Sequence, residues 1–399
     1  MKLYINSIKT LSFSVMAAAF FMMTGCSDGE YNVLDTHAYI EEALSNTGVK
    51  VTVDAHGESY AKLNVHLSDL TSGDNHYKLV PDQSVLDNYN AVNGTSYIML
   101  PKEQYVLPED IVVKSGQYAS EEISVTLKAF SQEMMKSGES YALPVKLVAQ
   151  NGSTPVMATT GTFVLLAESI VEFSAPMFTG AADLVAKAFQ DAPETYNQYT
   201  IEVRFQVSNT ENRNRAIFSA SDNSADPKKS ILLRFEDPQS TNENYQAHSL
   251  VQIQLHKGYV NPTKAFETNK WQHLAVTFDG ARYRIYVNGV DSGVLEASSA
   301  MTTFKNVSWF SGSAWWSGCK ILMSEARIWS VCRSAIQIQN NMTQVRPSSD
   351  GLEAYWRFNE GSGNVFNDAT GKGHTLTTSA TPTWVNGILS TDTSTAWPK

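Results

Sequence analysis

One short stretch of the chain, SWFSGSAWWSG at 308–318, combines several aromatic residues with small ones and is called the aromatic segment below. Its flat apolar rings belong to Trp309, Phe310, Trp315 and Trp316. Sugars stack their apolar faces on such rings, while amides and carboxylates bind their hydroxyl groups. These four residues are therefore the candidate glycan-binding site. The alternative is that the same rings pack in the hydrophobic core.

The acidic residues after position 168 do not form the pairs expected of a glycoside hydrolase. On one strand, an acid and a nucleophile must lie two residues apart to share a face. This region contains no Glu-x-Asp, Asp-x-Glu or Glu-x-Glu. The chain also lacks the Gly-x-Ser-x-Gly turn of serine hydrolases and the His-x-His or His-Glu-x-x-His spacing of zinc sites. We predict that the protein is not an enzyme; carboxylates that come together from separate strands remain the alternative.

Alternating residues after position 270 predict strands that could position a binding site. Apolar side chains recur at positions 274, 276 and 278, and again at 283, 285 and 287. A period of two is typical of a half-buried strand. Asp-Gly at 279–280 and Asn-Gly at 288–289 are typical of tight turns because both tolerate positive φ. An antiparallel meander is therefore predicted.

Three segments resemble parts of one known family. WQHLAVTFDG at 271–280 resembles the central strand of a laminin-G-like (concanavalin A-like) jelly-roll domain, ILMSEARIWSVCRSAIQI at 321–338 its long strand and following helix, and GLEAYWRFNEGSG at 351–363 its closing strand. The resemblance covers residues 168–399. It implies a lectin-like β-sandwich in which Trp316 packs against the sheet.

The same resemblance implies a bound calcium ion, because laminin-G-like domains often hold one. Asp368 in NDATGKGH at 367–374 is the candidate metal ligand, together with backbone carbonyls of that turn. Calcium takes about six to eight oxygen ligands. A single Asp in a Gly-rich turn also commonly accepts hydrogen bonds from its own backbone. A Ca²⁺ site at Asp368 and a plain β-turn therefore both remain open.

Residues 31–167 are predicted to form a separate domain. Short strand-like runs at 49–54, 60–67, 122–127, 141–148 and 161–167 are spaced as in a β-sandwich, and a helix capped by Asp82 is predicted at 82–92. The stretch from Val80 to Pro108 resembles the uncharacterised N-terminal domain of polysaccharide-utilisation lipoproteins from Bacteroidota. The resemblance implies an immunoglobulin-like sandwich that acts as a spacer or as an accessory glycan contact.

The first thirty residues predict export and lipidation. LSFSVMAAAFFMM at 11–23 is too short for a permanent membrane span, and with its basic start it predicts a signal peptide over residues 1–25. Met-Thr-Gly-Cys at 23–26 resembles a bacterial lipobox, which implies acylation of Cys26 and attachment to a membrane through acyl chains. The alternative is an ordinary secretory signal. SDGE at 27–30 resembles the acidic tether of outer-membrane lipoproteins that face the cell exterior.

Composition and motifs together predict the class of protein. A net charge of -10 argues against nucleic acid as a partner. We expect an all-β chain, with an immunoglobulin-like sandwich followed by a concanavalin A-like/laminin-G-like jelly roll. The predicted function is non-catalytic capture of glycan by a surface lipoprotein of a polysaccharide-utilisation system, with an outer-membrane transporter complex as a further partner. An adhesin-like module for host or matrix protein and a glycoside hydrolase are the alternatives.

Overall fold

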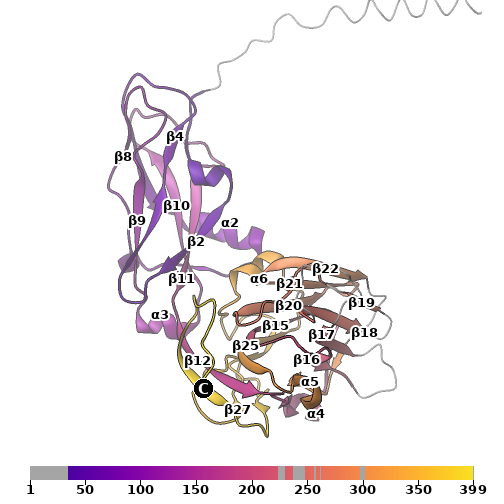
Figure 1. The fold of residues 1–399 in the computed structure, drawn as a ribbon. Helices are drawn as coiled ribbons and strands as arrows, with labels where there is room; N and C mark the ends of the chain where they lie inside the picture. The colour runs from indigo at the N-terminus through magenta and orange to yellow at the C-terminus, as the bar shows by residue number, and fades with distance from the viewer. Residues whose placement is uncertain are drawn as a thin grey trace, which may run out of the picture.

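A computed structural model describes residues 35–222, 230–236, 248–255, 258–260, 262–296 and 302–398. The predicted signal peptide, Cys26 and the tether at 27–30 lie outside these residues. Two β-domains meet at an angle, and helix α2 (Gln83–Asn93) of the first lies near helix α6 (Ala335–Asn340) of the second (Figure 1). Strands dominate both domains, which confirms the all-β prediction. No helix in the described ranges is long and apolar enough to cross a bilayer.

The N-terminal domain is a sandwich of two main sheets around a core of aliphatic and aromatic residues. The larger sheet has the order β2 (Gly48–Val53), β11 (Thr162–Ser169), β10 (Tyr141–Ala149), β5 (Asn75–Pro81) and β8 (Ile111–Val113), with β6 (Ile98–Met99) beside β10. The smaller sheet has the order β3 (Glu58–Leu63), β9 (Ile123–Lys128) and β7 (Tyr105–Val106), and β1 (Ala38–Ile40) pairs with β4 (Val65–Leu67).

Helix α2 has the predicted Asp82 cap and spans Gln83–Asn93, one residue later at each end than the predicted 82–92. The Asp82 carboxylate accepts a hydrogen bond from the Ser84 amide at 2.9 Å, and Gly94 ends the helix in the left-handed conformation with φ of 60°. Leu86 and Tyr89 bury the apolar face of the helix in a small cluster with residues of β10 and β11. The domain also contains η1 (Glu41–Leu44), η2 (Lys102–Gln104) and α3 (Gln132–Ser137).

The C-terminal domain is a second sandwich, whose two large sheets are called sheet 1 and sheet 2. Sheet 1 has the order β22 (Val290–Glu296), β21 (Arg282–Val287), β20 (Gln272–Phe278), β15 (Tyr199–Val207), β25 (Lys320–Trp329), β12 (Glu172–Thr179) and β29 (Thr383–Leu389), with β26 (Leu352–Trp356) beside β25. Sheet 2 has the order β19 (Gly258–Val260), β18 (Leu250–Leu255), β17 (Ile231–Glu236), β16 (Arg215–Ala220), β24 (Ser308–Ser311), β13 (Leu184–Ala186), β28 (Leu376–Thr377) and β27 (Val365–Phe366). β14 (Glu194–Tyr196) pairs with β23 (Thr302–Phe304), and the short helices α4 (Lys187–Asp191) and α5 (Ser313–Trp316) complete the domain with α6.

The predicted meander is present, but its first strand is buried on both faces rather than on one. Every residue of β20 is buried. One face lies in the core between the sheets, and on the other Ala275 packs against Tyr286 and Ile338 of α6. The end of the chain covers the neighbouring part of sheet 1, where the Trp271 indole donates to Thr395 Oγ1 at 2.7 Å. The prediction of a half-buried strand was wrong because segments distant in sequence cover the outer face.

Candidate functional site

The aromatic segment turns three of its four rings into the core. Trp309, Phe310 and Trp316 have no exposed surface. Phe310 adopts positive φ of 47°, which interrupts the strand alternation, and both Trp309 and Phe310 belong to the core cluster. The Trp316 indole donates to the carbonyls of Ala216 and Ser311, each at 3.1 Å. These three rings are core residues in this structure and offer no face to a sugar.

Trp315 is the member of the segment that reaches solvent, with 45% of its surface exposed. Gly312 directly precedes helix α5, and its φ of 95°, which suits glycine, turns the chain back after β24. Buried Arg215 donates from Nε to the Trp315 carbonyl at 2.9 Å. The indole is therefore exposed on a backbone that the core holds in place.

Asp183 lies next to this turn and was missed by the sequence analysis. Its Oδ1 accepts the Gly312 amide at 3.0 Å, across a separation of 129 residues. Gly312 is itself close to the indole, because a Cβ at that position would lie 3.7 Å from Trp315 Cδ1. A carboxylate and an exposed indole thus share one turn. No local pattern in the sequence could have shown that pairing.

Asp368 organises its own turn. Its Oδ1 accepts the amides of Tyr355 and Thr370 at 3.1 and 3.0 Å, and its Oδ2 accepts the His374 amide at 3.1 Å. Both carboxylate oxygens therefore accept hydrogen bonds from backbone N–H groups. This is the pattern expected of a plain β-turn, the alternative to a Ca²⁺ site. Among the described residues, no group of three or more His, Cys, Asp or Glu side chains could hold a metal ion.

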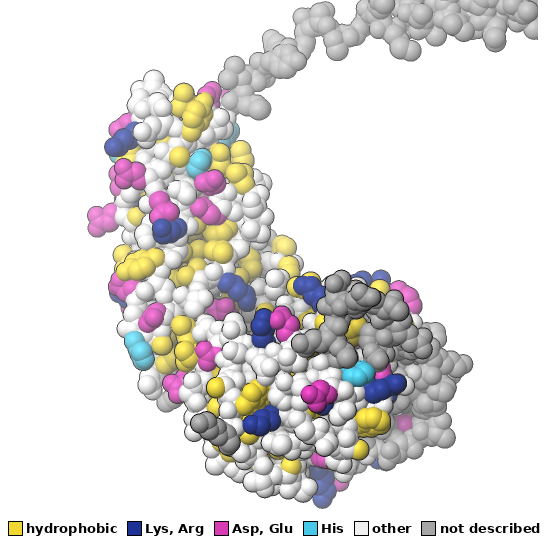
Figure 2. All heavy atoms as spheres, in the orientation of Figure 1, with side chains coloured by type: hydrophobic (Ala, Val, Ile, Leu, Met, Phe, Trp, Pro, Cys, Tyr) yellow, Lys and Arg dark blue, Asp and Glu magenta, His cyan; other side chains and the backbone are white. Residues whose placement is uncertain are grey.

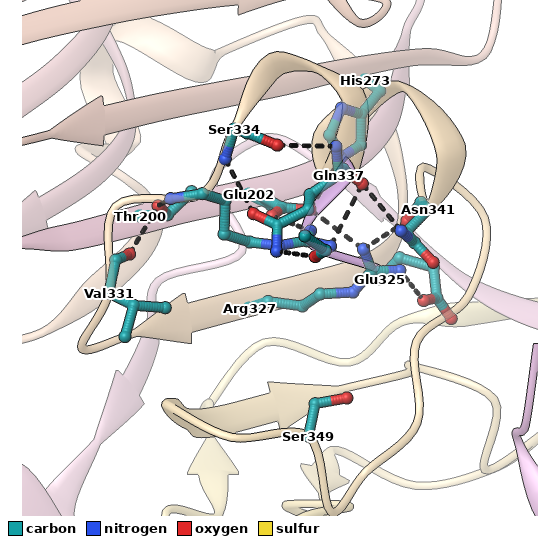
Figure 3. A network of polar contacts seen from close by, with 12 residues as sticks. Thr200, Glu202, His273, Glu325, Arg327, Val331, Ser334, Gln337, Asn341 and Ser349 are labelled. Atoms are coloured by element: carbon teal, nitrogen blue, oxygen red, sulfur yellow. Dashed lines mark hydrogen bonds and ion pairs between the residues drawn. The ribbon is translucent and has the colours of Figure 1, made fainter. Parts of the chain in front are cut away.

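Glu202 of β15 is the centre of a buried ionic cluster on the outer face of sheet 1 (Figure 3). Its carboxylate contacts Arg333 Nη1 at 2.5 Å and Arg327 Nη1 at 3.0 Å, and lies 3.3 Å from His273 Nε2. Arg327 also pairs with Glu325, a bulge residue of β25 with φ of 56°. Sequence reasoning placed His273, Glu325, Arg327 and Arg333 in family motifs. It did not find the cluster, because its members come from three strands and a loop.

The cluster brings together two carboxylates from separate strands, the arrangement that the hydrolase alternative requires. Burial alone would raise the pKa of Glu202, but Arg333, His273 and Arg327 outweigh burial and hold that pKa far below its usual range. An ionised Glu202 cannot be the general acid of glycoside hydrolysis, and its complete burial keeps it from a substrate that it would attack as the nucleophile. The two arginines also donate to backbone carbonyls of α6 and the residue after it, which covers the cluster. The geometry is that of a structural ion-pair network.

Comparisons with known proteins identify both domains. A family model described as an N-terminal domain matches residues 34–154, and the model of the concanavalin A-like lectin/glucanases superfamily matches residues 179–339. The chain therefore carries this N-terminal domain followed by a concanavalin A-like domain, which confirms the two resemblances. A search of curated proteins finds no match.

Several solved structures are similar at low identity. A candidate carbohydrate-binding protein from Bacteroides ovatus is 23% identical, with 88% of this chain and 97% of that chain covered and a TM-score of 0.49. A pentraxin from Limulus polyphemus is 15% identical, covers 54% of this chain and 89% of its own, and has a TM-score of 0.32. The sialyllactose-bound CBM40 of a Ruminococcus gnavus sialidase is 11% identical, covers 42% and 98%, and has a TM-score of 0.30. These similarities are too distant to transfer a ligand to this chain.

Proposed function

We propose that this protein is a non-catalytic glycan-binding lipoprotein that captures carbohydrate with its concanavalin A-like domain. The observation that carries the proposal is Trp315, an indole 45% exposed on a turn anchored in the core. Exposed aromatic rings on rigid loops are typical sugar platforms, since stacking requires a flat apolar face that is already in place. Asp183 beside the same turn would accept hydroxyl groups of the bound sugar.

The absence of catalysis is part of the proposal. Glu202 and Glu325 are engaged by Arg327, and Glu202 is completely buried. Neither carboxylate is placed to meet a substrate. Capture without cleavage is therefore the activity that we propose for this domain.

Lipidation at Cys26 would hold the protein on the outer membrane, facing the cell exterior. Many copies on one membrane raise the effective concentration of binding sites for a long polysaccharide. Weak single-site affinity would then suffice for retention, and the captured glycan would pass to an outer-membrane transporter complex of a polysaccharide-utilisation system. Labelling with a radioactive fatty acid, and its loss in a Cys26→Ala variant, tests the anchor.

A glycan array tests the binding function. The chain without residues 1–30 is applied with Ca²⁺ and with chelator, beside Trp315→Ala and the control Tyr118→Ala, which removes another exposed ring, 53% exposed, from the N-terminal domain. If a sugar covers about 50 Å² of the indole, stacking contributes about 1.2 kcal/mol, or roughly 8-fold in Kd. We expect that loss for Trp315→Ala and none for the control.

Each outcome of the array separates the candidate functions. Selective binding that Trp315→Ala weakens supports the proposal, and its loss in chelator would add Ca²⁺ to the site. Binding to no glycan would refute the proposal and favour the adhesin-like alternative. Release of reducing sugar by purified protein would refute the non-catalytic part.

A further inference from the structure

A polar cleft lies between the two domains, with one wall from each. The N-terminal domain contributes residues 94–97 and 139–140, and the C-terminal domain contributes Val331 and residues 345–346 and 348–350 among others. The cleft has a cavity volume of about 360 Å³, at the lower end of the range for small-ligand sites. Figure 2 shows basic and acidic side chains gathered around the junction of the domains.

Direct contacts hold the two walls in place. The Gln337 side chain in α6 donates to the carbonyl of Gly94, the residue that ends α2. Lys50 Nζ donates to a backbone carbonyl of the C-terminal domain at 3.0 Å, and Arg346 Nε lies 3.0 Å from a Glu139 carboxylate oxygen. Because these contacts span the junction on several sides, the cleft is preformed and does not need domain closure.

Tyr97 in the wall of this cleft has a hydroxyl with unused hydrogen-bonding capacity. The residue is only 8% exposed, and within the described part of the chain its hydroxyl has no hydrogen-bond partner. Burial raises the pKa of this phenol well above its ordinary value, so the hydroxyl stays protonated and can donate. The hydroxyl is not one of the fully buried unpaired polar atoms, so a small ligand or water can still reach it.

Other groups around the cleft are also uncommitted. Among described residues, the side chains of Ser96, Ser140 and Ser348 make no hydrogen bond, and Asp350 makes no ion pair. Two arginines, Arg333 and Arg346, and two carboxylates, Glu139 and Asp350, line the cleft. Their formal charges cancel. A neutral lining with free hydroxyl groups favours a neutral ligand rich in hydroxyls over a phosphate, a uronate or a cation.

We propose that the cleft between the two domains is a saccharide site that accepts neutral sugar units, with Tyr97 and Ser96 on one wall and Ser348 and Asp350 on the other. The site is distinct from the turn that carries Trp315. It rests on the proposed function only in the class of its ligand. The N-terminal domain is then part of the binding apparatus.

Amide hydrogen exchange on the chain without residues 1–30 locates the site. The probes are hexasaccharides of glucose, mannose and xylose, with hexagalacturonate as the anionic probe. We expect a neutral probe to slow exchange in residues 94–97 and 345–350 together. Tyr97→Phe should weaken that binding by about 2- to 12-fold, the worth of one hydrogen bond, without lowering the Tm, because the lost hydroxyl has no partner in the free protein.

A bulky substitution and its control make the test independent of Tyr97. Ser348 is exposed, so Ser348→Trp should fold normally and fill the cleft. Ser45→Trp, at an exposed position in the N-terminal domain, is the matched control and should bind as the parent does. Loss of protection at both walls in Ser348→Trp alone supports the proposal.

The contrary outcomes are distinguishable. Protection confined to the turn at Trp315 would overturn the cleft site and leave the proposed function intact. Protection of the cleft by hexagalacturonate alone, or unchanged protection in Ser348→Trp, would also overturn it. Binding of no probe at any position would overturn both proposals.

Discussion

Glu202→Gln is expected to destabilise the C-terminal domain strongly, because one carboxylate serves two buried guanidinium groups. Arg327 and Arg333 are 0% and 6% exposed, and both contact Glu202. Glutamine would keep the shape of the side chain and remove its charge. Arg327 would retain its pair with Glu325, whereas Arg333 would have no carboxylate partner in the cluster.

The size of the effect follows from burial. Breaking a buried ion pair by removing one partner costs about 3–5 kcal/mol, whereas an exposed pair is worth about 0–1 kcal/mol. Glu267→Gln is the matched control, because Glu267 pairs with Lys270 at side-chain exposures of 62% and 53%. The two substitutions make the same chemical change in the same domain and should differ by several kcal/mol.

Urea unfolding followed by tryptophan fluorescence measures this difference directly. All eight tryptophans lie at or after position 271, so the signal reports on the C-terminal domain. We expect a much lower midpoint for Glu202→Gln at an unchanged m-value. A loss of unfolding free energy below about 1 kcal/mol, within the range of an exposed pair, would refute the view that the cluster is a structural ion-pair network.

Three further measurements test the other assignments. Trp316→Ala should lower the unfolding free energy by about 3–5 kcal/mol and Trp315→Ala by under about 0.5 kcal/mol, since only the first ring is buried; equal losses in urea titrations would contradict their placement. Burial lowers the pKa of His273 despite the neighbouring Glu202, so the folded domain holds this imidazole neutral. The unfolded chain protonates it near pH 6.5, so stability should fall as the pH drops from 7.5 to 5.5, and His273→Gln should reduce that fall; an identical pH dependence in the variant would exclude His273. Asp368→Ala should lower the free energy of unfolding by about 1–3 kcal/mol, equally with Ca²⁺ and with chelator. A decrease in stability, measured by calorimetry, that is seen only with Ca²⁺ would show that the carboxylate binds metal.

Features that depend on neighbouring residues could be predicted from the sequence. Asp-Gly and Asn-Gly with alternating apolar residues predicted β20, β21 and their turns, which the structure contains. The Asp82 cap predicted the start of α2, and the structure begins that helix one residue later. These signals are local, since each turn or cap depends on residues two or three positions apart.

Features that depend on tertiary contacts could not be predicted in the same way. The positive φ of Phe310 places this ring and the preceding one in the same core, against the strand alternation. The bulge at Glu325 shifts the register between β15 and β25. Residue spacing therefore could not predict that Glu325 and Glu202 both pair with Arg327. Tyr97 belongs to the stretch that resembles the N-terminal domain family, and only the second domain makes it part of a cleft.

The contacts at the domain junction change what the N-terminal domain can contribute to binding. A flexible spacer would leave the two domains free to reorient, and a ligand touching both would have to pay for ordering them. Here α6 covers the ionic cluster of sheet 1 and also holds Gly94 through Gln337. The helix that seals the outer face of the second domain is thus the element that positions the first. A ligand in the cleft would meet two walls already fixed, so the affinity it gains should depend on hydroxyl contacts such as that of Tyr97 rather than on domain closure.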